Sequence, residues 1–186
     1  MASVLVPLAD GFEEIEALTI VDVLRRGGQK VVTAALEDNV EVVGAHGIAV
    51  KADTTLGDVI DETYGAIVLP GGGGGTERLR NCSALIKRLQ RQANENRLLC
   101  AICAAPVVLV DAGVLERDVH VTCYPTCQME LDRPWASAPV VADGNVITGQ
   151  APGSAMLFAL VVLKTLAGEK VAGNVARQMV TDVLDQ

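Results

Sequence analysis

Short apolar runs bounded by glycine, proline and polar residues alternate along the chain with longer stretches whose apolar positions recur at helical spacing. The short runs predict strands at Ser3–Leu8, Gln29–Ala35, Ala66–Leu69, the first half of Leu98–Val110, and Val119–Cys123. Hairpins are predicted at Glu41–Ala45 with Ile48–Lys51, and at Val140–Ala142 with Val146–Thr148 around Asp143-Gly144-Asn145.

The longer stretches predict helices, with acidic residues near the start and basic residues or glycine near the end where these signals occur. The expected helices are Glu13–Arg26, Thr55–Ile60, Ser83–Asn94, a short one closed by Gly113, Ser154–Ala167 and Glu169–Leu184. A helical turn is expected at Pro125–Leu131 and an irregular loop at Asp132–Ala138. This alternation predicts one domain over residues 1–186, an α/β sandwich with a mostly parallel sheet.

Composition narrows the choice of function. Half of the 186 residues are hydrophobic and only 3% are aromatic, as suits a Val-, Leu-, Ile- and Ala-rich parallel sheet covered on both faces. The net charge of −8 argues against a nucleic acid as partner, because phosphate binding needs a basic face. No signal peptide or membrane-spanning run is recognisable, so a cytoplasmic protein with reduced cysteines and no disulfide framework is expected.

Leu98–Val110 passes from a buried strand into an Ala-rich segment with Pro106 at a first helical turn. A strand that turns this sharply into a helix is an elbow, and Cys103 stands at its tip. The amino-terminal dipole of the following helix would favour a thiolate, so we expect a lowered thiol pKa and the most reactive of the five cysteines. The plainer interpretation is that Cys103 is a small buried apolar residue.

Two further segments meet the elbow in a parallel sheet, because parallel strands bring their carboxyl ends to one edge. The first is the Asp10–Glu16 loop, from which one glutamate facing the cleft would exchange protons with Cys103, although surface acids at a helix start would look the same. The second is the glycine run Gly71–Gly75, whose amides would bind an oxyanion unless the run is merely flexible. Thr76-Glu77 excludes a P-loop.

Cysteine spacing raises a metal site as an alternative. Cys100–Cys103 and Cys123–Cys127 superficially resemble two pairs of zinc ligands. Strand alternation would direct Cys100 and Cys103 to opposite faces, which argues against zinc and against a thioredoxin-like pair. We therefore expect no metal and no other cofactor.

Ala101-Ile102-Cys103-Ala104-Ala105-Pro106 resembles the nucleophile elbow of the ThiJ/PfpI superfamily. Gly11–Glu16 is similar to the glutamate segment of one branch of it, that of the parkinsonism-associated protein deglycase. The resemblance continues at Val21–Gly28, Leu69–Gly72 and Pro152–Ser154, and it covers essentially the whole chain.

The resemblance implies a flavodoxin-like three-layer α/β/α sandwich, a single class I glutamine amidotransferase-like domain and a homodimer. It implies that Cys103 is the nucleophile and Glu16 its acid/base partner. The positions implied to bind the oxyanion or the substrate are Gly71, Gly72, Ala104, Tyr124 and Pro152.

The departures from the family pattern concern histidine. Ala104 follows the cysteine where peptidase-type relatives carry histidine, and Tyr124 stands where a family histidine is often found. The only histidines are His46 and His120, and neither is expected beside Cys103. A Cys-His-Asp peptidase is therefore disfavoured.

Two functions remain open from the sequence. The first is a glutathione-independent glyoxalase, or deglycase, in which Cys103 attacks methylglyoxal or a related small aldehyde and Glu16 moves the proton. The second is a redox-sensing stress-response or chaperone protein in which Cys103 is oxidised beside a protonated Glu16.

Overall fold

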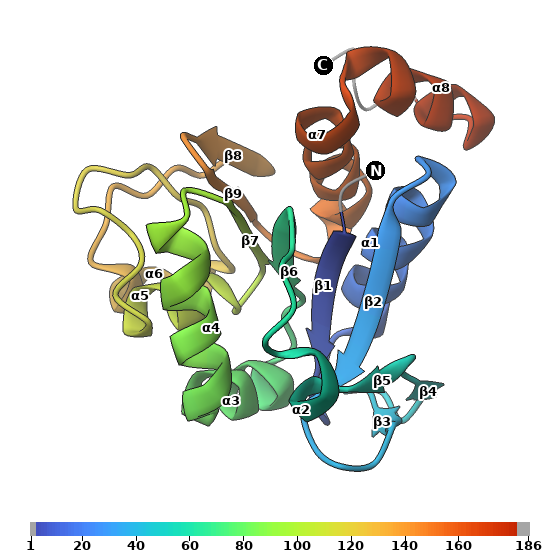
Figure 1. Ribbon diagram of the computed structural model, residues 1–186. Helices are drawn as coiled ribbons and strands as arrows, with labels where there is room; N and C mark the ends of the chain where they lie inside the picture. Colours follow the sequence, from blue (N-terminus) through green and yellow to red (C-terminus); the bar gives the residue numbers. More distant parts are fainter. Residues whose placement is uncertain (1–2, 182–186) are drawn as a thin grey trace.

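A seven-stranded sheet of order β5-β2-β1-β6-β7-β9-β8 forms the middle layer of the computed structural model, which describes residues 3–181 (Figure 1). Every neighbouring pair is parallel except β8 and β9, which are antiparallel. The strands are β1 (Ser3–Leu8), β2 (Lys30–Ala35), β5 (Thr54–Thr55), β6 (Ala66–Leu69), β7 (Leu98–Ile102), β8 (Val140–Asp143) and β9 (Val146–Gly149).

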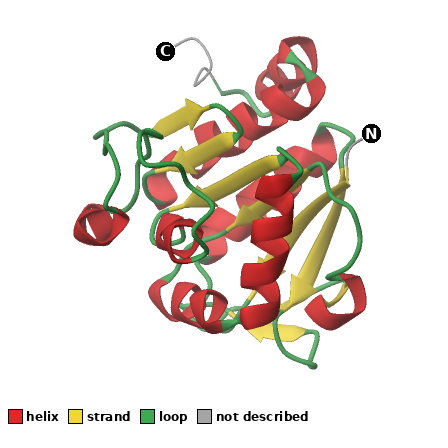
Figure 2. Cartoon of the chain, turned by 60° about the vertical axis from the view of Figure 1, so that its left-hand side comes forward, coloured by secondary structure: helices red, strands yellow, loops and turns green. Residues whose placement is uncertain are grey.

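Helices cover both faces of this sheet (Figure 2). One face carries α1 (Glu14–Arg26), α7 (Ala155–Ala167) and α8 (Glu169–Gln178). The other carries α2 (Leu56–Val59), α3 (Gly73–Asn81), α4 (Ser83–Asn94), α5 (Pro106–Asp111) and α6 (Gln128–Leu131). This is the predicted flavodoxin-like three-layer sandwich.

Strand alternation divides the core between the two faces. In β1, Val4 and Val6 pack toward α1 and α7, whereas Leu5 packs on the opposite side. In β7, Cys100 and Ile102 lie on the α1 side and their neighbours on the other. Both faces of the central strands are therefore buried, which explains why these strands read as continuous apolar runs.

Helix α1 follows the expected pattern of apolar spacing and terminal charges. Its inward positions are buried, and Arg25 and Arg26 occupy its last turn. Gly28, with φ of +75°, follows the helix end in the left-handed region that glycine adopts without strain. The helix thereby brings its first turn to the carboxyl edge of the sheet.

A separate two-stranded hairpin, β3 (Glu41–Val43) and β4 (Ala49–Lys51), confirms the first predicted hairpin. The turn at Asp143-Gly144-Asn145 confirms the second, because β8 and β9 pair antiparallel across it. The helical turn after Pro125 is also present, as a 3-10 turn (Pro125–Cys127) that leads into α6. A second 3-10 turn, Pro152–Ser154, precedes α7.

Three expectations are wrong in detail. The glycine run is not wholly a loop, because α3 begins inside it at Gly73. Val119–Cys123 is not a strand: β9 takes the place beside β7, and Val121 makes only a single bridge to Trp135. The apolar character of this segment therefore reflects burial without strand pairing.

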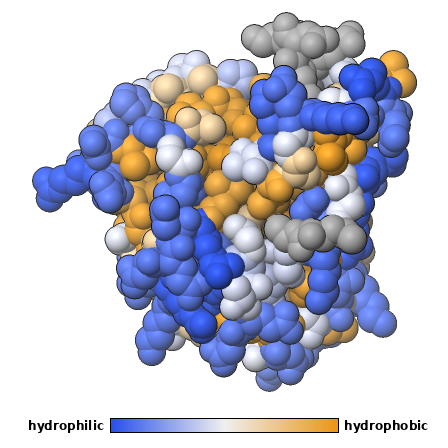
Figure 3. All heavy atoms as spheres, turned by 45° about the horizontal axis from the view of Figure 1, so that its top comes forward, coloured by the Kyte–Doolittle hydropathy of each residue, from blue (hydrophilic) through white to orange (hydrophobic). Residues whose placement is uncertain are grey.

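The final helix is shorter than expected, since α8 ends at Gln178 and Val180 has φ of +53°. The part of the predicted helix at 182–184 lies outside the described residues. Within residues 3–181, no helix is both long and apolar enough to cross a membrane. Figure 3, with the top of Figure 1 brought forward, shows apolar side chains between mostly hydrophilic ones on that face.

Candidate active site

The elbow after β7 holds Cys103 in an unusual backbone conformation. Its φ of +64° lies in the left-handed region, which non-glycine residues rarely adopt. The Cys103 N–H donates to Gly149 O at 2.9 Å, and its carbonyl accepts the Tyr124 N–H at 2.7 Å. The surrounding backbone thus enforces a strained residue, an arrangement that is common at functional sites.

Glu16, in the first turns of α1, is completely buried. Its Oε2 accepts the Gly71 N–H at 2.7 Å, while its Oε1 has no hydrogen-bond partner among the described residues. Burial raises the pKa of Glu16 to about 7, although the Gly71 N–H and the Cys103 thiol oppose this rise. The predicted neutral form of Glu16 is therefore accessible near neutral pH.

Cys103 and Glu16 interact directly, as the sequence predicted. Burial raises the pKa of the Cys103 thiol, and the charge of Glu16 raises it further. The N–H groups of Gly72 and Ala104 lower it, but less strongly. The expectation of a lowered thiol pKa is therefore wrong, because burial and the neighbouring carboxyl group outweigh the local N–H donors.

Glycine is required where the loop after β6 passes between these two residues. A Cβ on Gly71 would lie 2.7 Å from both Cys103 Cβ and Glu16 Oε2. Gly72 has φ of +89°, and a Cβ there would collide with the backbone of Gly11. The glycines therefore allow the backbone of this loop to approach Cys103, Glu16 and Gly11 closely. This role, and not simple flexibility, explains why glycine occupies these positions.

The backbone N–H groups that could bind an oxyanion differ in one respect from those that the family resemblance implied. The Gly71 N–H is already bound to Glu16, so it positions the acid and is not free for an oxyanion. The N–H groups of Gly72 and Ala104 act on the Cys103 sulfur and face the reacting atom. They remain the candidates for stabilising negative charge there.

The other implied positions border the elbow through the backbone. Tyr124 contributes its N–H to Cys103, but its half-exposed side chain makes no hydrogen bond to another residue of 3–181. Pro152 opens the turn after β9, the strand whose Gly149 carbonyl holds Cys103. A direct contact of either side chain with the thiol stays a prediction.

Glu14 is not the surface acid that its position suggested. It is only 5% exposed, and its carboxylate accepts the backbone N–H of His46 at 2.7 Å and lies 2.8 Å from His46 Nδ1. These hydrogen bonds outweigh burial and lower the pKa of Glu14 to about 2. The residue ties α1 to the β3–β4 hairpin, a role that no pattern in the sequence indicated.

Glu13, Glu14 and His46 are the one group among residues 3–181 whose side chains are close enough together to hold a metal ion. The Glu14–His46 ion pair already satisfies two of these three groups. His120 is far from this cluster in the sequence and contacts Asp143. Among residues 3–181, His46 is thus bound to Glu14 and His120 to Asp143, and no hydrogen bond joins either ring to Cys103.

All five cysteines are free. Cys100 and Cys103 border the same apolar cluster, contrary to the expectation from strand alternation. The reason is that the strand ends at Ile102, and the positive φ of Cys103 turns its side chain back. Cys123 and Cys127 pack on the opposite face of the sheet, so the four cysteines do not form one metal site.

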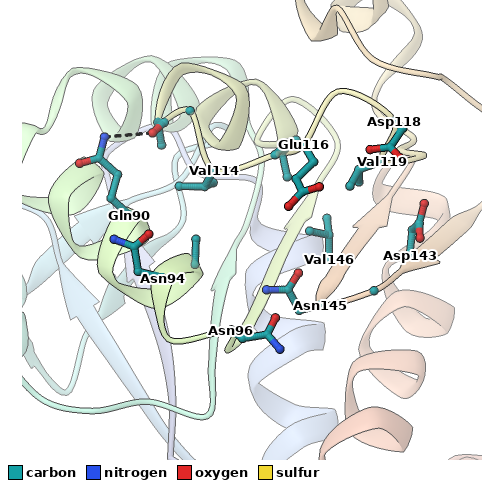
Figure 4. Close-up of a pocket in the computed structure, with 15 residues that line it drawn as sticks. Gln90, Asn94, Asn96, Val114, Glu116, Asp118, Val119, Asp143, Asn145 and Val146 are labelled. Atoms are coloured by element: carbon teal, nitrogen blue, oxygen red, sulfur yellow. Dashed lines mark hydrogen bonds between the residues drawn. The ribbon is translucent and has the colours of Figure 1, made fainter.

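A cavity of about 760 Å³ lies at the opposite edge of the sheet, where β7 and β9 begin (Figure 4). Amide and carboxylate side chains line it, among them Asn94, Asn96, Glu116 and Asp143. No cysteine, serine or threonine lines this cavity.

Comparison with known proteins adds three findings. The model of the DJ-1/PfpI family matches residues 2–165. The chain is 38% identical over 179 residues to Protein DJ-1 homolog B of Arabidopsis thaliana, covering 95% of this chain and 41% of that protein. The chain therefore spans less than half the length of this plant relative.

Two other relatives match over nearly their full lengths. The glutathione-independent glyoxalase DJR-1.2 of Caenorhabditis elegans is 33% identical over 181 residues, covering 96% of this chain and 95% of that protein. The structure of oxidized Toxoplasma gondii DJ-1 superposes with a TM-score of 0.94 at 36% identity, covering 98% of this chain and all of that chain.

Proposed function

Because the chain belongs to the DJ-1/PfpI family, we propose that it is a cysteine-dependent, glutathione-independent enzyme acting on methylglyoxal and related reactive aldehydes or their early adducts. The reaction would be of the glyoxalase or deglycase type and would need no cofactor. Cys103 would take the place of an external thiol.

The first step would be attack of Cys103 Sγ on the aldehyde carbon. As the S–C bond forms, the thiol proton passes to the Glu16 carboxylate. The aldehyde oxygen becomes an oxyanion beside the N–H groups of Gly72 and Ala104. A thiol of raised pKa suits this order of events, because the proton leaves during attack and no free thiolate is needed beforehand.

The second step would move hydrogen within the substrate. Glu16 first returns the thiol proton to the oxyanion, which forms the hemithioacetal hydroxyl. Its carboxylate then removes the hydrogen on the former aldehyde carbon as a proton and delivers it to the neighbouring ketone carbon, while the hydroxyl proton moves to the ketone oxygen. The aldehyde carbon is thereby oxidised to a thioester while the ketone is reduced to an alcohol, so no external oxidant or reductant takes part. Water then hydrolyses the thioester, which releases lactate and restores the thiol.

The observation that carries this proposal is the fully buried Glu16, which has one oxygen held by Gly71, the other without a hydrogen-bond partner among the described residues, and the Cys103 thiol as a neighbour. A carboxyl group with a pKa of about 7 can accept and return a proton at neutral pH. Neither packing nor charge pairing explains why this acid is buried.

The test is lactate formation from methylglyoxal by purified protein without glutathione. Cys103→Ser should abolish turnover, and Glu16→Gln should reduce it by roughly 10²-fold or more while keeping the fold. Cys82→Ser and Glu41→Gln serve as controls, since both residues lie outside the site, and they should retain activity. Equal turnover by Glu16→Gln and the wild type would contradict the role of Glu16.

A second candidate function is redox sensing, in which peroxide oxidises Cys103. Two molecules of hydrogen peroxide would convert the thiol to a sulfinic acid and release two molecules of water. Neutral Glu16 and the Gly72 and Ala104 amides would donate hydrogen bonds to the sulfinate oxygens. Mass spectrometry after peroxide treatment tests this: oxidation confined to Cys103 that is lost in Glu16→Gln supports it, and oxidation spread over all five cysteines contradicts it.

We also propose that the protein is cytoplasmic and forms a homodimer, with no nucleic acid or membrane as a stable partner. Support for the dimer comes from exposed apolar side chains on two neighbouring elements, α1 and the β3–β4 hairpin. These side chains are Ile15, Leu18, Val43 and Ile48. A surface of this kind favours association with a second copy.

A further inference from the structure

Arg88 of α4 is a buried cation without a counter-ion. The residue is 3% exposed, although arginine is almost never fully buried unless it is paired with an acid. No ion pair of Arg88 exists among residues 3–181. A buried charge of this kind costs stability unless something compensates it.

Its hydrogen bonding is also incomplete. Nη2 donates to Gln92 Oε1 at 2.9 Å, while Nε and Nη1 have no acceptor in the described part of the chain and are shielded from solvent. The guanidinium carbon lies 5.7 Å from the centre of the Tyr64 ring, a contact that compensates part of the charge. Two buried donor nitrogens of Arg88 are thus without a hydrogen-bond acceptor among the described residues.

The surrounding charges do not supply the missing anion. Burial lowers the pKa of the Arg88 guanidinium, and the neighbouring Arg91 and Arg97 lower it further. Glu95 opposes this, but its carboxylate is engaged by Arg91 at 3.0 Å and by Arg97 at 2.9 Å. The local environment is therefore short of negative charge.

Arg88 also forms part of the wall of a cavity of about 260 Å³ between α4 and the end of α2. Lys87 and Arg91 of α4 line the same cavity, and within residues 3–181 neither an ion pair nor a hydrogen bond engages Lys87. Asp61 lies on the opposite wall, and it too makes no ion pair among the described residues. Three cations against one carboxylate leave the cavity with a net positive lining.

We propose that this cavity binds a small oxyanion, a phosphate or carboxylate group, which acts as the counter-ion of Arg88. Lys87 and Arg91 attract the anion at the rim, and the Arg88 guanidinium turns toward it to use its unpartnered nitrogens. Ile60 and Ala84 leave room for a short apolar substituent. Asp61 competes with the anion for the same cations.

The proposal is tested by titrating the full chain with inorganic phosphate, and separately with acetate, at constant ionic strength against chloride. Calorimetry measures affinity, and the Arg88 Nε–H signal in the NMR spectrum reports contact. Phosphate or acetate should shift that signal and chloride should not; the tighter of the two identifies the oxyanion class.

Two substitutions decide the role of the cavity. Lys87→Gln should weaken binding several-fold, and Asp61→Asn should tighten it by about threefold because it removes a competing charge. Arg26→Gln, a surface change on the other side of the sheet, should leave affinity unchanged. Methylglyoxal turnover should be unaltered in all three variants.

The opposite response to Asp61→Asn would overturn the proposal. If Asp61 is itself the counter-ion, its replacement destabilises the protein and does not strengthen phosphate binding. An unmoved Arg88 signal with both probes would also contradict the site. The signal should be absent from the spectrum of Arg88→Lys, and its absence there confirms that the resonance belongs to Arg88.

Discussion

At the scale of single residues, the properties of Cys103 and Glu16 are set by each other. Burial raises the pKa of both groups, and a charge on one raises the pKa of the other. The first proton to leave belongs to the pair, and it leaves near the pKa of Glu16, about 7. Glu16 is therefore poised as a base above this pH and as an acid below it.

The pH dependence of turnover follows from this pair. The rate of methylglyoxal consumption at low substrate should rise as pH increases through about 7, because ionised Glu16 is needed to accept the thiol proton. Steady-state kinetics from acidic to alkaline pH measure this rise in rate. In Glu16→Gln the rise near neutral pH should disappear. If the rise persists in this variant, the titrating group is not Glu16.

Stability should show the opposite trend with pH. The pKa of Glu16 is raised on folding from 4.5 to about 7, so the folded state binds its proton more tightly than the unfolded state. The resulting stabilisation is complete below about pH 4.5 and is lost as pH rises through 7. Denaturant titrations should show this loss in the wild type and not in Glu16→Gln; the same loss in both would contradict the assignment.

At the scale of elements, one contact couples α1 to the β3–β4 hairpin. Glu14 accepts hydrogen bonds from the His46 backbone and pairs with its ring, and His46 has a raised pKa chiefly because of Glu14. The Asp10 side chain adds a hydrogen bond to Val43 N at 2.9 Å. The hairpin is thus held by acids that precede Glu16 in the chain.

Glu14→Gln should therefore not be silent. It removes a buried carboxylate that is held ionised by its hydrogen bonds, so the melting temperature should fall, by about 2–4 °C for each kcal/mol lost. The carboxylate's contribution should be present at neutral pH and lost on acidification toward pH 2, through the lowered pKa of Glu14. Hydrogen exchange of the His46 amide should accelerate. Unchanged exchange and melting would show that the contact contributes nothing.

At the scale of the whole molecule, the same region is where a second copy would associate. Ile15 and Leu18 on α1 and Ile48 on the hairpin are exposed together, and Ile15 immediately precedes Glu16. A dimer formed here would bring the partner close to the edge of the sheet that carries Cys103. Assembly and activity would then be coupled.

Ile15→Glu should convert the proposed dimer into a monomer, because it places a charge in an apolar contact. Light scattering at micromolar concentration measures the mass. Val180→Glu is the matched control, since Val180 is an apolar and more exposed position just beyond the end of α8. A wild-type mass of one chain would refute the dimer.

The sequence by itself determined the architecture. Strand runs such as Ala66–Leu69 and helices such as Ser83–Asn94 are local patterns of burial and spacing, and they agree with the structure. It also indicated that Cys103, the Asp10–Glu16 loop and the glycine run meet, because parallel strands deliver their following loops to one edge. These conclusions depend only on periodicity and topology.

The tertiary structure alone decided how those groups behave. The thiol pKa depends on burial and on the neighbouring Glu16, which no local pattern encodes, and these outweigh the backbone N–H donors that lower it. Two of the decisive contacts join residues far apart in the chain: the hydrogen bond from the Gly71 amide to Glu16 and the one between Glu14 and His46. The unpaired state of Arg88 depends on the residues packed around it. Electrostatic environment is a property of the packed molecule, and it appears only when the whole chain has folded around the group.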